Sequence, residues 1–156
     1  MSRDFVAISL YNVAYERSEL GTTFLPVGQM LQIDRVFQIV NAHLVCEVDV
    51  KGHWTFPIHF PSDPIFPGTL LIEAAGQAIA IWAWHIGARG RPRLGKVSAK
   101  FENPVLPDDE TIRLEVSVRQ KKNVFLGDVN LYVLDKKIAA VKAMIIIVPE
   151  APNPRR

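Results

Sequence analysis

The sequence predicts an α+β protein in which one antiparallel sheet wraps around a single long central helix. Residues 69–86 form an apolar, alanine-rich stretch of helical length, and glycines at 87 and 90 followed by Pro92 end it. Later runs alternate apolar and polar residues, which is typical of half-buried strands. A sheet must bury its apolar face, and only one helix is available to cover it.

The first half of the chain contributes fewer strands. Residues 30–37 read as a helix or strand entering the core, and residues 52–68 form a loop rich in proline and aromatic residues. Residues 43–50 predict a half-buried strand. Its buried face is expected to hold Leu44, Cys46, Val48 and Val50, whereas His43, Val45, Glu47 and Asp49 mostly face water.

The second half is dominated by strands. Alternation predicts them over 96–102, 111–119, 124–134 and 138–148, with a proline-bearing turn at 103–109. Residues 144–148 are continuously apolar, so both faces of the last strand are expected to be covered. Five or six strands around one helix leave sheet edges open, and we therefore expect a homodimer or an assembly of dimers.

Length and composition bound the organisation of the chain. Its 156 residues suit one domain, which we place at 25–148, after a leader segment at 1–24 and before a tail at 149–156 that we expect to be disordered. The net charge of +2 excludes nucleic-acid binding by bulk electrostatics. A single cysteine, Cys46, excludes an internal disulfide framework and fits a reducing cytoplasm, and the first residues lack the pattern of a signal peptide.

The stretch from 64 to 88 is long enough to span a bilayer, and Glu73 is its only formally charged residue. However, it opens with two prolines and a glycine, and it also carries Gln77 and His85. We therefore expect a thin helix packed inside the protein and no membrane span.

Glu73 and His59 are the candidate catalytic residues. A carboxylate in an uncharged run needs a partner, and Gln77 lies one helical turn further on, where its amide can orient the carboxylate. His59 opens a loop stiffened by three prolines, so its imidazole can be held in place. The helix then starts at Gly68, where backbone N–H groups suit a developing oxyanion. Taken singly, a buried carboxylate satisfied by neighbours or an ordinary loop histidine explains each feature equally well.

The residues from His59 to Gly68, His-Phe-Pro-x-x-Pro-x-x-Pro-Gly, followed by Glu73-x-x-x-Gln77, resemble the signature of the 3-hydroxyacyl-[acyl-carrier-protein] dehydratases. The resemblance extends to Met30–Val36 and Lys100–Pro107 and covers about residues 25–148. It implies the hotdog fold, a homodimer, no cofactor, and two composite sites that each combine His59 of one chain with Glu73 of another. It further implies that His59 removes the α-proton, that Glu73 protonates the departing hydroxyl, and that the Gly68 N–H holds the thioester carbonyl.

Two departures leave the branch of that family open. The residue before the histidine is Ile58, where the Glu-bearing branch often has glycine. The turn Pro107-Asp108-Asp109 resembles the Asp-bearing branch, which can also isomerise the double bond, whereas Glu73 points the other way. A specialised pathway enzyme would fit this mixture.

Other residues have secondary roles in this hypothesis. The expected apolar substrate tunnel would be lined by Ile65, Phe66, Trp82 and Trp84, although aromatic residues on a buried helix are more often plain core. A basic segment would steer an acidic acyl carrier protein, or else form a solvated loop; it consists of Arg89, Arg91, Arg93, Lys96 and Lys100. No cluster has metal-ligand spacing and no phosphate-binding loop occurs, so we expect no metal and no cofactor.

The leading functional hypothesis is dehydration of a 3-hydroxyacyl thioester, carried on acyl carrier protein, to a trans-2-enoyl thioester. A hotdog thioesterase is the second hypothesis, because that class also uses a carboxylate on the central helix, although the proline-rich His59 loop argues against it. A non-catalytic acyl-binding or assembly subunit is the third.

Overall fold

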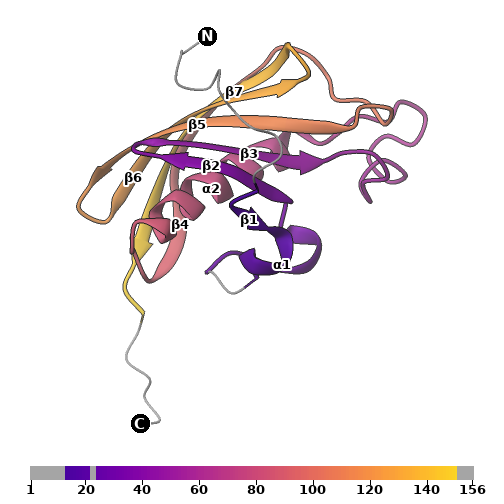
Figure 1. Ribbon diagram of the computed structural model, residues 1–156. Helices are drawn as coiled ribbons and strands as arrows, with labels where there is room; N and C mark the ends of the chain where they lie inside the picture. The colour runs from indigo at the N-terminus through magenta and orange to yellow at the C-terminus, as the bar shows by residue number, and fades with distance from the viewer. Residues whose placement is uncertain (1–12, 22–23, 151–156) are drawn as a thin grey trace.

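The computed structural model describes residues 13–21 and 24–150. Figure 1 shows one layer of strands curved over a long helix, with the loop between β3 and α2 projecting from one end. The elements are β1 (Tyr15–Glu16), α1 (Arg17–Leu20), the 3-10 turn η2 (Gly28–Met30), β2 (Arg35–Val40), β3 (His43–Asp49), α2 (Gly68–His85), β4 (Arg91–Phe101), β5 (Thr111–Lys121), β6 (Val124–Val133) and β7 (Lys136–Val148).

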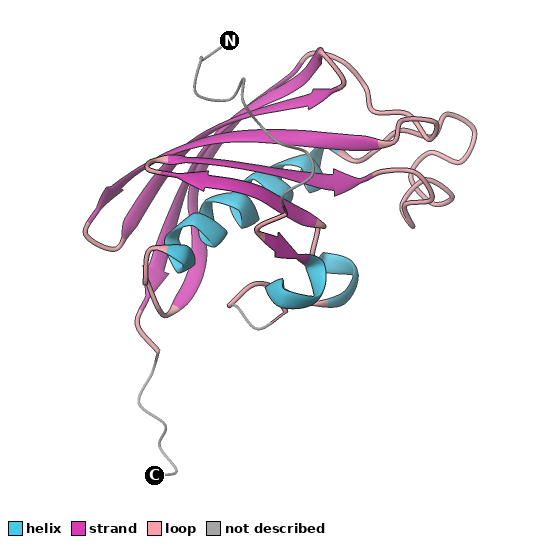
Figure 2. Cartoon of the chain, in the orientation of Figure 1, coloured by secondary structure: helices cyan, strands magenta, loops and turns pink. Residues whose placement is uncertain are grey.

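The described strands form one sheet in the order β1-β2-β3-β5-β6-β7-β4, and every neighbouring pair is antiparallel. The chain leaves β3, forms α2 under the sheet, and returns as β4 at the far edge (Figure 2). The predicted α+β architecture of one antiparallel sheet around one long helix is therefore confirmed. Because the sheet curves, α2 contacts strands from its middle and from one of its ends.

Helix α2 spans Gly68–His85, within one residue of the predicted range at each end. It starts after Pro67, whose fixed φ suits a helix entrance, and it ends before Gly87, which adopts a φ of 102°. Ten of its residues are buried, which explains why its sequence is apolar on nearly all sides.

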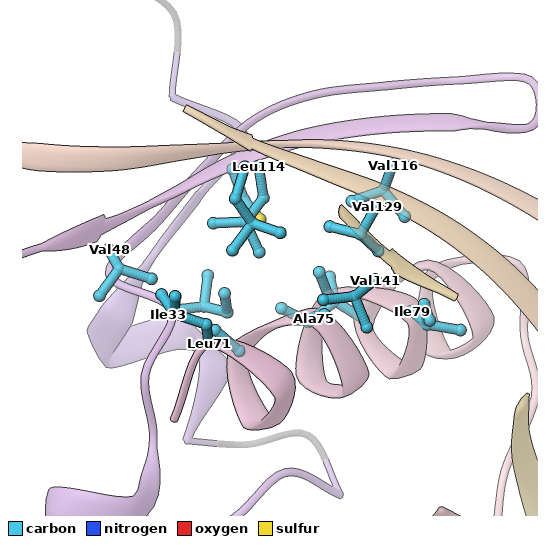
Figure 3. Close-up of a cluster of buried hydrophobic side chains, with 14 of the residues drawn as sticks. Ile33, Val48, Leu71, Ala75, Ile79, Leu114, Val116, Val129 and Val141 are labelled. Carbon is cyan, nitrogen blue, oxygen red and sulfur yellow. The ribbon is translucent and has the colours of Figure 1, made fainter. Parts of the chain in front are cut away.

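The core lies between α2 and the concave face of the sheet. Figure 3 shows Leu71, Ala75 and Ile79 of the helix beneath strand residues such as Leu114 and Val129. On β3 the expected inward residues are buried, but Val45 is buried as well, with 1% exposure. The prediction that Val45 faces water is wrong because it lies in a central strand, flanked by Gln38 on β2 and Glu115 on β5.

The helix and β6 approach each other closely at Gly127. A Cβ atom built on Gly127 would lie 2.3 Å from Cδ1 of Ile79, a separation that side chains do not tolerate. The absence of a side chain at this one position therefore lets α2 sit deep against the sheet.

Three features differ from the sequence prediction. Part of the expected leader packs onto the sheet, because β1 pairs with β2 and Leu20 of α1 is fully buried. Strand β4 begins at Arg91 rather than near residue 96. In β7, Ile145 and Ile147 are buried while Met144 and Ile146 stay half-exposed, so the expectation that both faces are covered is only half right.

The two edges of the sheet are unequal. The β1 edge has two residues, whereas the β4 edge has eleven, and β4 pairs with β7 alone among the described strands. On the helix-facing side of β4, Leu94 is 53% exposed, Val97 36% and Phe101 50%. A long strand edge with exposed apolar side chains is the surface at which another strand can add.

Candidate active site

His59 lies in the loop between β3 and α2 and is held by the main chain. Its N–H donates to the carbonyl of Thr55 at 2.8 Å, and its ring Nδ1 lies 2.9 Å from the carbonyl oxygen of Ile65. Because a carbonyl only accepts, Nδ1 carries the proton of the neutral imidazole. Nε2 is then the basic atom of this half-buried ring, which is the arrangement that a general base requires.

The residue after His59 is conformationally strained. Phe60 has a φ of 54°, a left-handed conformation that costs a bulky L-residue about 1–2 kcal/mol. Its ring lies 4.5 Å from the imidazole ring, and its carbonyl accepts a hydrogen bond from the Asp63 N–H at 2.8 Å. The surrounding loop thus imposes a tight turn beside His59, as is common at functional sites.

The start of α2 presents a backbone donor that the helix itself does not use. The N–H groups of Leu70 and Leu71 donate to the Pro67 carbonyl, whereas Gly68 is the first residue of α2 and its N–H has no intrahelical acceptor. The ring of Phe101 closes over Gly68, where a Cβ atom would meet it at 3.0 Å. A side chain at this position would crowd that ring, and the Gly68 N–H lies at the positive end of the helix.

Glu73 lies in the second turn of α2 and its carboxylate is oriented by Gln77. The Gln77 amide donates to Glu73 Oε1 at 2.9 Å and to the Met30 carbonyl at 2.7 Å. Its own oxygen accepts the N–H of Gln32 at 2.8 Å. Because Gln77 is 3% exposed and all three contacts are directional, its amide can adopt one orientation only. That orientation fixes one carboxylate oxygen of Glu73.

Glu73 lines an apolar groove with a volume of about 380 Å³. The groove runs along α2 past Gly76 to Ala80, small residues spaced one helical turn apart. Its walls come from the segment before η2, from α2, and from β4 and β7; they are Phe24, Leu25, Pro26, Ile72, Pro92, Arg93, Leu94 and Ile145, with Gln77 beside Glu73. Apolar walls with one oriented carboxylate at the end suit an acyl chain whose reacting carbons lie next to Glu73.

The four residues expected in a substrate tunnel are not among the described residues that line this groove. Ile65 instead holds the His59 ring through its carbonyl, and Phe66 is buried against His53 and Phe56. Trp82 is a core residue whose Nε1 donates to the Asn41 carbonyl at 2.9 Å. Trp84 packs edge-on against Tyr15 and beneath the guanidinium of Arg89.

The sequence carries a signal for one part of the groove. Gly76 and Ala80 are small and lie on the helix face of Glu73, a spacing that leaves room beside the carboxylate. The wall residues at 24–26 and 92–94 carry no such signal, because they are far from α2 in the sequence.

The basic residues are placed on the edge strand. Arg91, Arg93, Lys96 and Lys100 lie on β4, opposite outward-facing partners on β7, and Arg89 lies just before it; all five are exposed. They therefore form a strand-borne surface rather than a loop.

Other chemistry receives little support within residues 13–21 and 24–150. There, no group of three or more metal-ligating side chains occurs, and no helix is long and apolar enough to cross a membrane. Complete burial raises the pKa of the Cys46 thiol, which keeps it protonated and unreactive. No hydrogen bond or ion pair joins His59 to Glu73 within the described part of the single chain.

One helix enclosed by a curved antiparallel sheet defines a hotdog protein, and the loop histidine and helix carboxylate give it acid-base groups. The chain belongs to the FabA-like domain family, whose model matches residues 25–142.

Solved structures agree on the fold. The dehydratase heterocomplex ApeI:P from Xenorhabdus doucetiae superposes with a TM-score of 0.67 at 18% identity, over 84% of this chain and 90% of that one. A thioesterase from Staphylococcus aureus superposes with a TM-score of 0.61 at 12% identity, over 73% of this chain and 92% of that one. The smu.793 protein from Streptococcus mutans, bound to acetyl CoA, superposes with a TM-score of 0.63 at 11% identity, over 82% of this chain and 96% of that one. Because dehydratases and thioesterases both occur among these neighbours, the fold does not decide the reaction.

Proposed function

We propose that this protein dehydrates a 3-hydroxyacyl thioester to a trans-2-enoyl thioester. The observation that carries the proposal is the pair of prepared groups: His59 with its basic Nε2, and Glu73 oriented by Gln77 at the end of an apolar groove. Elimination of water needs a base for the α-proton and an acid for the departing hydroxyl, and these two residues supply them.

In this proposal the thioester carbonyl lies at the start of α2. The Gly68 N–H donates to its oxygen and stabilises the negative charge that develops when His59 Nε2 removes the α-proton. The electron pair of the broken C–H bond forms the new double bond. The bond from the β-carbon to oxygen breaks, and Glu73, which enters the cycle protonated, transfers its proton so that water leaves. Proton exchange with solvent then restores both side chains.

We further propose that the working unit is a homodimer that pairs through the β4 edge. The exposed apolar residues on the inner side of β4, Leu94, Val97 and Phe101, would be covered by a second copy. His59 of one chain would then act with Glu73 of the other, consistent with the lack of a bond between them within one chain.

The acyl group would be delivered by an acidic carrier protein. Arg91, Arg93, Lys96 and Lys100 project from the outer face of β4, the strand that also contributes Pro92, Arg93 and Leu94 to the groove walls. Exposed cations accelerate association with an acidic partner, so added salt is expected to raise KM for the carrier-bound substrate.

The test is a turnover assay on 3-hydroxyacyl thioesters, followed by enoyl formation and by release of free thiol. The parent is expected to form enoyl product. His59→Ala and Glu73→Gln are each expected to lower kcat by about 10²-fold or more, the usual contribution of a general acid or base, while the protein stays folded. Retained activity in either variant would contradict the assigned roles.

Hydrolysis of an acyl thioester is the second candidate. A carboxylate in an open groove can also activate water, and thioesterases share this fold. Thiol release without enoyl product would favour hydrolysis, and in that case Glu73→Gln would abolish activity while His59→Ala would have a smaller effect.

A further inference from the structure

A series of hydrogen bonds connects Glu73 with the loop that carries His59, and His53 lies at its centre. From Glu73 the series passes through Gln77 to the N–H of Gln32, which is itself 2% exposed. The Gln32 side chain donates through Nε2 to the carbonyls of Gln29 and Met30, at 2.8 and 3.3 Å. Its Oε1 is thereby turned toward Nε2 of His53, 3.2 Å away.

The neighbours of His53 select one tautomer of its ring. Because Oε1 of Gln32 only accepts, Nε2 of His53 carries the proton. Nδ1 then accepts from the hydroxyl of Thr55 at 2.8 Å, with the Thr55 N–H 3.4 Å away. The Thr55 carbonyl in turn accepts the N–H of His59. The neutral ring therefore satisfies the network toward Glu73 and toward His59 at the same time.

The surroundings favour this neutral ring. His53 lies between Trp54, which stacks on it at 5.5 Å, and Phe66, at 4.7 Å. Burial, helped by the charge of Arg17, lowers the pKa of His53 below its ordinary value. The charged groups around the same cleft are Arg17, Asp34, Asp49 and Lys51. Protonation would place a hydrogen on Nδ1, where the Thr55 hydroxyl and N–H now donate.

We propose that His53 is a positioning residue that aligns both catalytic groups from one point, through Gln32 and Gln77 to Glu73 and through Thr55 to His59. The proposal rests on the proposed function. In a dimer with composite sites, the His59 and Glu73 of one chain belong to two different sites. One His53 would therefore align half of each site, so its loss would impair both.

The test uses the full chain and a matched pair of variants at Thr55, which is 3% exposed. Thr55→Val keeps the shape of the side chain but removes the hydroxyl, so Nδ1 loses its donor at 2.8 Å and keeps only the Thr55 N–H at 3.4 Å to hold the ring on that side. We expect kcat for a 3-hydroxyacyl thioester to fall by about tenfold or more, with KM within about twofold, because catalysis is sensitive to small misplacements. Thr55→Ser restores the hydroxyl and is expected to keep kcat within about twofold of the parent.

A second readout is independent of turnover. In protein labelled with ¹⁵N-histidine, NMR spectra at neutral pH are expected to show the Nε2–H tautomer for His53 in the parent and in Thr55→Ser, and a mixture of tautomers in Gln32→Met, which lacks the acceptor for the Nε2–H. His53→Gln assigns the signal. Should Thr55→Val fail to fold, Gln32→Met, which removes the acceptor of the His53 Nε2–H, is expected to lower kcat by a similar factor.

The possible results separate the two proposals. A parent that makes no enoyl product overturns the proposed function, and this inference falls with it. A parent that turns over while Thr55→Val keeps its kcat overturns the inference alone. Equal losses in Thr55→Val and Thr55→Ser, or an Nδ1–H tautomer in the parent, would also overturn it.

Discussion

His59 and Glu73 are held in place by different kinds of contact. The imidazole is fixed by main-chain groups: its own N–H, the Ile65 carbonyl and the strained turn at Phe60. The carboxylate is fixed by a side chain, the Gln77 amide, which is itself clamped by residues 30 and 32. Side-chain substitutions should therefore disturb Glu73 readily, whereas His59 should respond mainly to changes in backbone conformation.

The largest effect concerns whether the two groups act from different chains. His59→Ala and Glu73→Ala are each expected to be inactive alone. Co-expressed with different tags and purified through both, they should recover roughly half of parental activity, because every selected dimer is mixed and has one complete site of two. The measurement is enoyl formation by the doubly purified mixture. A mixed dimer without activity would place both groups of a site in one chain.

The next effect concerns the side-chain clamp. Gln77→Leu removes the donor to Glu73 and leaves the buried Gln32 N–H unpaired, at a cost of about 1–3 kcal/mol in the free energy of unfolding. We expect kcat to fall by about tenfold or more. Urea unfolding and steady-state kinetics measure both quantities.

Asn123→Ala is the control for that experiment, since it also removes a side-chain hydrogen bond to a main-chain carbonyl, that of Ile147. Asn123 lies in the turn between β5 and β6, far from Glu73 in the sequence. It should lower stability while leaving kcat unchanged. If Gln77→Leu behaved like this control, Gln77 would have no role in orienting the carboxylate.

A smaller effect is expected at the strained turn. Phe60→Asn places a residue that tolerates the left-handed conformation at this position, whereas Phe60→Val places a β-branched one. The Val variant should be less stable than the Asn variant by about 1–2 kcal/mol, and kcat should follow the same order. Because Phe60 is 60% exposed, lost burial contributes little to this difference. Equal unfolding free energies for the two variants would contradict the assigned strain.

The smallest effect is a pH dependence of stability due to His53. Its pKa is lower in the folded protein than in the unfolded chain, where it is about 6.5. As the pH falls below that value the unfolded chain binds more protons, so stability falls until the pH passes the folded pKa. Thermal unfolding between pH 8 and 5 should therefore show a smaller acid loss in His53→Gln than in the parent. An identical loss of stability in both proteins would show that His53 does not contribute to the pH dependence.

Much of the fold is predictable because its elements are periodic. The alternation of β5 and the apolar length of α2 gave their ranges within a few residues. The predicted range of β4 starts too late in the sequence. Both faces of this strand are largely exposed, so Arg91 and Arg93 carry no burial pattern. Elements β1 and α1 were missed because they bury only Leu20.

The candidate site was predictable only where its contacts are local. Gln77 lies one turn from Glu73, so helical spacing alone brings the two side chains together. The Gln32–Gln77 and Gln32–His53 bonds join residues 45 and 21 positions apart, and no local pattern announces them. The predicted tunnel residues are apolar side chains in the His59 loop and on the helix, but Phe66 and Trp82 fill the core instead.

Two glycines of this fold differ in how they can change during evolution. Gly127 has no room for a side chain, because Ile79 lies against it. At Gly76, in the groove, an added Cβ would meet only Cδ1 of Ile145 at an ordinary 3.5 Å, and alanine would favour the helix by about 0.5–1 kcal/mol. Under the proposed function, mutations at Gly76 would therefore alter which acyl groups fit without unfolding the protein. Substitutions that change the shape of the groove can therefore be selected at Gly76, whereas packing against Ile79 excludes substitutions at Gly127.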